Sequence, residues 1–172
     1  MTDAPPRGPD GPDEETIRLA TKLFNCAREG DSGTFQTLLP QGLPANLRNH
    51  KGDSLLMLAS YHGNHDTAQV LLEHGADPQL SNDQGQTPLA GAAYKGDLKM
   101  AELLLEYGAE VNACAPDGKT ALMFAAMFDR TEIVALLLAH GADPDARDSR
   151  GMTAHDLAQA MGAANTQDQL AS

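Results

Sequence analysis

Residues 82–114 read NDQGQTPLAGAAYKGDLKMAELLLEYGAEVNAC, and the same pattern recurs as NHKGDSLLMLASYHGNHDTAQVLLEHGADPQLS at 49–81 and as APDGKTALMFAAMFDRTEIVALLLAHGADPDAR at 115–147. Three series of glycines mark the register, each with a spacing of 33 residues. They are Gly52, Gly85, Gly118 and Gly151; Gly30, Gly63, Gly96 and, after Asp129, Gly162; and Gly42, Gly75, Gly108 and Gly141. One period shared by three independent series indicates an internal repeat, which is the signature of a solenoid.

Each repeat carries the signals of two short helices. Thr87 followed by Pro88 is suited to start the first helix, because the hydroxyl accepts a first-turn N–H and proline has no N–H to lose. The equivalent residues of the other repeats are Ser54, Thr120 and Thr153. Gly96 can adopt the left-handed conformation that ends this helix, and a second helix with a leucine pair follows. Asp129 replaces the glycine one repeat later and adopts this conformation less readily. We therefore expect Asp129→Gly to raise the melting temperature slightly.

The repeated units resemble the ankyrin repeat, whose hallmark is a DxxGxTPLHxAAxxG pattern followed by LLxxGADvNa. The resemblance covers residues 16 to about 170 and implies an all-α solenoid of stacked helix-turn-helix units joined by short β-hairpin loops. Five repeats are expected, of which the outer two are degenerate caps. The boundaries are 1–13 for an acidic, disordered Pro/Gly tail, 14–48 for the N-terminal capping repeat, 49–81, 82–114 and 115–147 for repeats 2 to 4, and 148–172 for the C-terminal capping repeat.

The composition alone indicates a disordered chain and not a solenoid. The 172 residues include only 32 Leu, Ile, Val and Phe, and the net charge of -12 places the chain at the edge of the range typical of disorder. The 27 alanines resolve this difficulty. They recur in the first helix of each repeat, where only small side chains let neighbouring repeats approach closely. The leucine pairs of the second helices are expected to fill the layer between repeats.

Several functional classes are disfavoured. The 24 acidic residues face 12 Lys and Arg, so no basic surface is expected for nucleic acid. No apolar run is long enough to span a membrane, and the N-terminus lacks a secretion signal, which together predict a cytoplasmic protein. Cys26 and Cys114 are 88 residues apart and form no disulfide framework. No catalytic motif, metal-ligand set or phosphate-binding loop is found, so we expect neither an enzyme nor a cofactor.

The candidate site is a surface for a partner protein. In ankyrin proteins, hairpin tips and the exposed end of the first helix line a concave face, and the resemblance implies the same here. On the first helices the candidate residues are Met57, Tyr61, His62, Tyr94, Lys95, Met123, Met127 and Phe128; on the hairpins they are Lys51, Gln84, Gln86, Lys119, Arg150 and Met152. Aromatic residues and Met are enriched at protein interfaces. The alternative is that Met127 and Phe128 only pack on the neighbouring repeat.

The expected function is that of a non-catalytic, monomeric adaptor, inhibitor or stabiliser of one partner protein. Two further features leave alternatives open. Gly91 stands within a helix where other repeats have Leu58, Phe124 and Leu157, which indicates either a shallow place in the groove or a tolerated defect. The overall acidity would favour a basic partner or serve solubility alone. A rival hypothesis is a chaperone-like or stress-related accessory protein without a specific groove, since some small bacterial ankyrin proteins are associated with catalase function.

Overall fold

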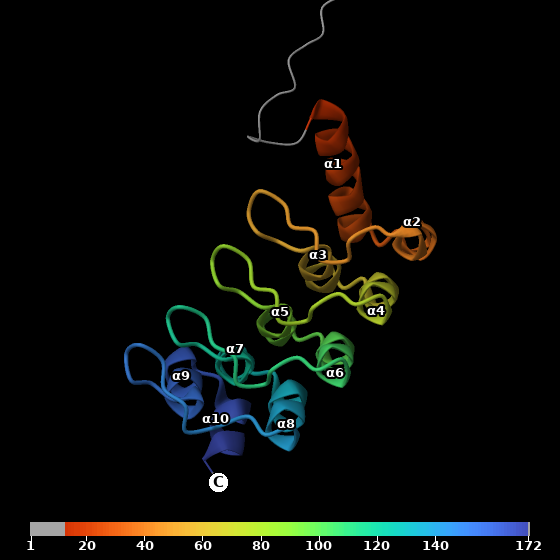
Figure 1. Cartoon of the computed structure of the whole chain (residues 1–172). Helices are drawn as coiled ribbons and strands as arrows, with labels where there is room; N and C mark the ends of the chain where they lie inside the picture. Colours follow the sequence, from red (N-terminus) through yellow and green to blue (C-terminus); the bar gives the residue numbers. More distant parts are fainter. Residues whose placement is uncertain (1–12, 172) are drawn as a thin grey trace, which may run out of the picture.

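The computed structural model describes residues 13–171 and is built from pairs of antiparallel helices (Figure 1). The expected tail, apart from Asp13, lies outside the described residues. In chain order the elements are α1 (Glu14–Glu29), α2 (Ser32–Leu38), the 3-10 helix η1 (Leu39–Gln41), α3 (Leu55–Tyr61), α4 (His65–Glu73), α5 (Pro88–Lys95), α6 (Leu98–Glu106), α7 (Ala121–Met127), α8 (Thr131–Ala139), α9 (Ala154–Met161) and α10 (Ala164–Leu170). The all-α solenoid expected from the sequence is confirmed.

The helices start where the capping residues predict. Thr87 accepts a hydrogen bond from the N–H of Ala90, and Ser54, Thr120 and Thr153 do the same for their own helices. At α9 the arrangement is a full capping box, since the carboxylate of Asp156 also accepts from the backbone N–H of Thr153. Helix α1, with 16 residues, is longer than the other first helices, and Asp13 is its N-cap. The side chains of Ile17 and Leu19 on its outer half are exposed.

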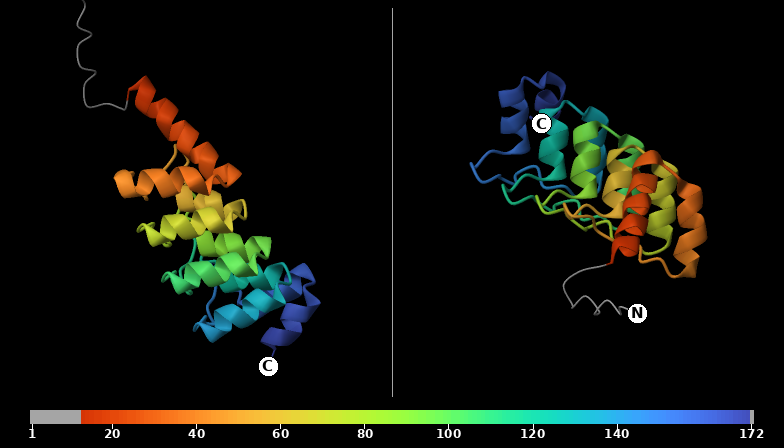
Figure 2. Two further views of the ribbon diagram at one scale, coloured as in Figure 1. Left: turned by 90° about the vertical axis from the view of Figure 1, so that its right-hand side faces the viewer. Right: turned by 90° about the horizontal axis from the view of Figure 1, so that it is seen from above.

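The first helices form one row and the second helices another (Figures 1 and 2). Helices α1, α3, α5, α7 and α9 pack in succession, so each contacts only its neighbours in the row. Their alanines lie at the contacts: Ala59, Ala93, Ala125 and Ala126 are completely buried. Leu71, Leu104 and Leu137 of the second helices are buried as well. The protein therefore forms a core although it has few large apolar residues, because these residues lie in register at every layer of the stack.

The loops that connect successive repeats project beyond the first helices. Each loop is closed by two backbone hydrogen bonds, for example from Asn82 N to Gln86 O at 3.0 Å and from Gly85 N to Asn82 O at 2.9 Å. Within residues 13–171 the only β-type pairings are two isolated bridges, Arg48 with Ser54 and Cys114 with Thr120. The expected β-hairpins are thus tight loops without extended strands.

A series of amides ties the opposite edge of the repeats together. Asn46, Gln79 and Asn112 are 33 residues apart, and each side-chain oxygen accepts the backbone N–H of a residue in the following repeat. The distances are 2.7 Å to Asp77, 2.7 Å to Glu110 and 2.8 Å to Asp143. These bonds join each repeat to the next at the segments that follow the second helices.

Candidate functional site

The loops and the first helices enclose a groove with two connected hollows. The first, which we call the outer hollow, has a volume of about 540 Å³. Its lining residues are His50, Lys51, Asp53, Met57, Leu58, Tyr61, Asn82, Asp83, Gln84 and Gln86. The second, which we call the Gly91 hollow, has a volume of about 320 Å³. Its lining residues are Met57, Tyr61, Gly85, Gln86, Thr87, Ala90, Gly91, Tyr94, Ala113, Ala115 and Phe124. Met57, Tyr61 and Gln86 line both hollows, so the two form one continuous surface.

The Gly91 hollow exists because two consecutive side chains are small. Ala90 and Gly91 of α5 occupy the positions held by Met57 and Leu58 in α3 and by Met123 and Phe124 in α7. A Cβ atom on Gly91 would meet nothing nearer than Cδ2 of Tyr61, at 3.8 Å. The space beside α5 is therefore open, while the same space beside α3 and α7 is filled.

Aromatic side chains from successive repeats hold one another at the groove. The rings of Tyr94 and Phe128 are 4.8 Å apart at an interplanar angle of 80°, an edge-to-face contact. The ammonium of Lys95 lies 4.2 Å from the centre of the Tyr61 ring. Tyr61 and Tyr94 nevertheless remain 43% exposed. Each ring thus contacts a side chain of the following repeat and is still partly exposed.

The structure separates the candidate residues of the first helices into three groups. Tyr61, His62, Tyr94 and Lys95 are exposed. Met127 and Phe128 are half-buried, and Met127 packs on the core. Met57 and Met123 are buried, with 5% and 1% exposure. Met57 still forms the floor of both hollows, whereas Met123 belongs to the core and has no surface to offer a partner.

The hairpin candidates are distributed unevenly along the groove. Lys51, Gln84 and Gln86 are exposed at the outer hollow. Lys119 is engaged instead with Asp117, at 2.9 Å, and its hydrogen bond lowers the pKa of that carboxyl group. Arg150 and Met152 lie on the last loop and line neither hollow.

The sequence interpretation missed most of the small residues of the Gly91 hollow. Gly85, Thr87, Ala113 and Ala115 come from two successive loops, and nothing in their local sequence marks them as neighbours of Gly91. A usable signal was present in α5, where Ala90 is small beside Gly91 in a register that elsewhere has Met followed by Leu or Phe.

The charge of the molecule is distributed unequally between the two halves of each repeat. Residues 49–62, 82–95 and 115–128, which supply the loops and first helices, contain three acidic and three basic residues. Residues 63–81, 96–114 and 129–147, which supply the second helices and the loops after them, contain eleven acidic and three basic residues. The acidity therefore belongs to the side away from the groove, and the groove itself is nearly neutral.

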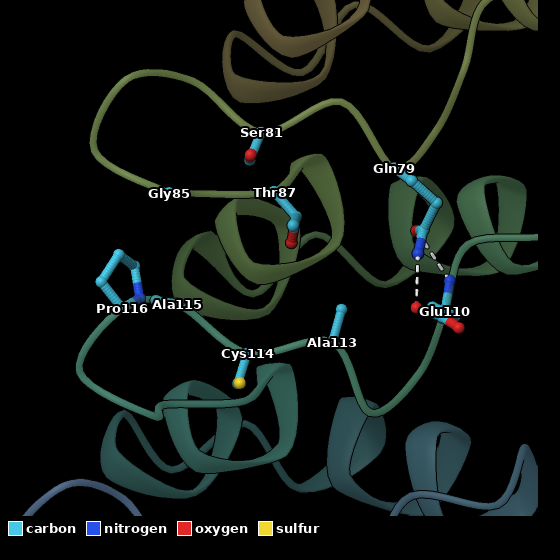
Figure 3. Close-up of a pocket in the computed structure, with 9 residues that line it drawn as sticks. All are labelled: Gln79, Ser81, Gly85, Thr87, Glu110, Ala113, Cys114, Ala115 and Pro116. Carbon is cyan, nitrogen blue, oxygen red and sulfur yellow. Dashed lines mark hydrogen bonds between the residues drawn. The ribbon is translucent and has the colours of Figure 1, made fainter.

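A further hollow of about 490 Å³ lies between two successive hairpin loops (Figure 3). The two hydrogen bonds between Gln79 and Glu110 close one side of it, and Cys114, Ala115 and Pro116 line the other. Cys114 is an exposed free thiol, while Cys26 is buried in the core. No group of His, Cys, Asp and Glu side chains suited to a metal ion occurs among residues 13–171. In that same part of the chain, no helix is long and apolar enough to span a bilayer.

Comparisons with protein-family models and with curated proteins both identify ankyrin repeats. A family model described as ankyrin repeats (3 copies) matches residues 23–115, and a model of the single ankyrin repeat matches residues 117–149. A Pseudomonas aeruginosa protein that is named as an ankyrin repeat protein is 64% identical over 52 residues. That alignment covers 30% of this chain and 30% of the relative, so the similarity spans less than a third of the relative's length.

Proposed function

The chain belongs to the ankyrin repeat family, and from this premise we propose that its groove binds a segment of a partner protein. Ankyrin repeats are in general non-catalytic modules for protein–protein interaction, and the proposal assigns that role to the two connected hollows. The protein would then act as an adaptor, or as an inhibitor or stabiliser of the partner. Its contact residues would be the exposed first-helix and hairpin candidates, above all Tyr61 and Tyr94.

The observation that carries the proposal is the pair of Tyr61 and Tyr94. Two tyrosines at the same position of successive repeats are 43% exposed beside one hollow. Large apolar side chains that are not needed to close the core commonly mark an interaction site when they lie in a concavity. Because each ring is already held by a neighbouring repeat, binding would cost little side-chain entropy.

The double variant Tyr94→Ala/Phe128→Ala tests the proposal. Affinity capture from the native host with the full chain as bait should recover a partner that the double variant loses. Tyr107→Ala is the matched control, because Tyr107 is 37% exposed at the end of α6, outside both hollows. The control should retain the partner, and circular dichroism should show that both variants remain helical. If the double variant retains every protein that the wild type captures, the groove is not the binding surface and a chaperone-like role without a specific groove is favoured.

A further inference from the structure

The fold gives no reason for a glycine at position 91. The residue lies in the middle of α5, and its φ is outside the left-handed region that favours glycine. A Cβ would make only an ordinary contact with Tyr61, at 3.8 Å. Glycine is also among the weakest helix formers. The equivalent Leu58, Phe124 and Leu157 show that a large side chain is compatible with this position of the repeat.

The hollow that results is uncharged. None of its eleven lining residues is acidic or basic, although 21% of the chain is charged. A charged group placed there would lose hydration without gaining an ionic partner, which is strongly unfavourable. An apolar group would instead contact Met57, Ala90 and the three aromatic rings that line the hollow.

The size of the hollow fits a single large side chain. A closed apolar cavity of about 150 Å³ is enough to hold benzene, and the Gly91 hollow measures about 320 Å³ and is open on one side. It continues into the outer hollow, where the exposed Gln86 lies at the junction. A chain that fills the Gly91 hollow with one side chain therefore has room to continue in extended form along the outer hollow.

We propose that the Gly91 hollow is a specificity pocket that receives one leucine, methionine or phenylalanine side chain from an extended, uncharged segment of the partner. This inference rests on the proposed function of the groove and adds the chemistry of the ligand. It also gives Ala90 and Gly91 a role, since they leave unfilled the volume that the ligand occupies. The overall acidity of the chain has no part in this recognition.

The experiment uses a display library of random nine-residue peptides, selected on the full chain. The peptides that are enriched should share one Leu, Met or Phe flanked by uncharged residues. Their affinity should fall by at least about tenfold in Gly91→Leu, which fills the hollow, because a large apolar group contributes at least that much in a matching pocket. Gly91→Ala is the matched control. It adds only a methyl group, which would make an ordinary contact with Tyr61 at 3.8 Å and leave most of the hollow open, so it should lower the affinity much less than Gly91→Leu.

Both variants should unfold at the same urea concentration as the wild type or at a higher one, because each removes a glycine from a helix. When the urea midpoint of Gly91→Leu is at or above that of the wild type, a loss of binding in this variant is not caused by unfolding. The proposal is overturned if the enriched peptides are basic, if they bind Gly91→Leu as well as the wild type, or if no peptide is enriched above a parallel selection on Gly91→Leu. Self-association in sedimentation that Gly91→Leu abolishes would also overturn it, by making a second copy of the chain the occupant.

Failure of the pocket and failure of the groove can be told apart. Peptides that tolerate Gly91→Leu but are lost in Tyr94→Ala would leave the groove as the binding surface and remove only the pocket. Peptides that tolerate both changes would remove the groove as well.

Discussion

Asp129 acts across a repeat boundary. It is the only non-glycine residue among residues 13–171 with a positive φ, 59°. Its carboxylate accepts hydrogen bonds from the backbone N–H of Thr166 at 2.9 Å and from the side-chain amide of Asn165 at 2.8 Å. The N-cap of α10 is Ala163, which has no side-chain oxygen to cap the helix. Asp129 thus caps α10 from the preceding repeat. Helix α6, by contrast, is capped by its own N-cap residue, Asp97.

We now expect Asp129→Gly to lower the melting temperature, contrary to the expectation from the glycine series alone. Glycine relieves the left-handed backbone but removes the cap of α10, and the loss of a cap lowers the melting temperature of a chain of this size by roughly 2–4 °C. The added change Ala163→Asp should restore part of the loss, because it places a carboxylate at the local N-cap. Calorimetry on the single and double variants tests this. A melting temperature that stays constant or rises in Asp129→Gly would show that the contact to Thr166 contributes no more than the left-handed backbone of Asp129 costs.

The same contact predicts a dependence on pH. The N–H of Thr166 lowers the pKa of Asp129 in the folded protein below its usual value. The stabilisation is therefore complete above the unfolded pKa of about 3.9 and is lost as the pH falls through the lower, folded value. Asp129→Asn keeps an oxygen for Thr166 but does not titrate. Its unfolding free energy should fall less steeply than that of the wild type below about pH 4. Parallel curves for the two proteins in acid would contradict this assignment.

At the scale of elements, the turn between the two helices of a repeat also joins that repeat to its neighbour. Asn64 is the N-cap residue of α4, yet its side chain makes no capping bond. Its amide instead donates to the carbonyl oxygens of Ala27 at 2.9 Å and Arg28 at 2.8 Å, at the end of α1. This one side chain therefore satisfies two carbonyls at the C-terminus of α1, the first helix of the N-terminal capping repeat.

Asn64→Asp should destabilise the protein although aspartate is a good N-cap residue. The change removes both donors and brings a carboxylate against two carbonyl oxygens, a loss of about 1–3 kcal/mol. Urea denaturation measures the effect. Asn25→Asp is the control with the same change of charge, because Asn25 is exposed on α1 and accepts a hydrogen bond from Arg28. Equal stability of the two variants would mean that the hydrogen bonds to Ala27 and Arg28 do not stabilise the packing of the N-terminal capping repeat.

The helices could be predicted from the sequence because their signals are local. The consecutive residues Thr87 and Pro88 mark the start of a helix, and the glycine series mark where the helices end. The contacts between repeats could not be predicted in this way. Asp129 accepts a hydrogen bond from Thr166, which lies 37 residues further along the chain. Asn64 donates to two backbone carbonyls, and a backbone carbonyl carries no sequence signal. The Gly91 hollow could be predicted in part, since the small residues Ala90 and Gly91 of α5 are evident in the sequence, but its other lining residues come from the neighbouring repeats and loops.

At the scale of the whole molecule, most acidic residues of the three central repeats lie on a different surface from the groove that we propose as the binding site. Each repeat contacts only its neighbours, so the loops and first helices form one long surface and the second helices form the opposite one. In the three central repeats the second-helix halves contain eleven acidic and three basic residues, whereas the groove halves contain three of each. The suggestion from the sequence that acidity favours a basic partner therefore applies to the second-helix surface and not to the groove.

Binding in the groove should accordingly be almost independent of salt. For a peptide selected as described above, the Kd should change by less than about twofold between about 50 and 500 mM NaCl, because the Gly91 hollow has no charged lining residue and the acidic and basic residues of the groove halves are equal in number. The double variant Glu102→Lys/Glu106→Lys makes the exposed side of α6 basic and should leave this Kd unchanged. An affinity that falls steeply with salt, or that responds to the α6 variant, would show that the acidic surface takes part in binding. In that case long-range attraction of a basic partner, and not the shape of the groove, would determine what the protein binds.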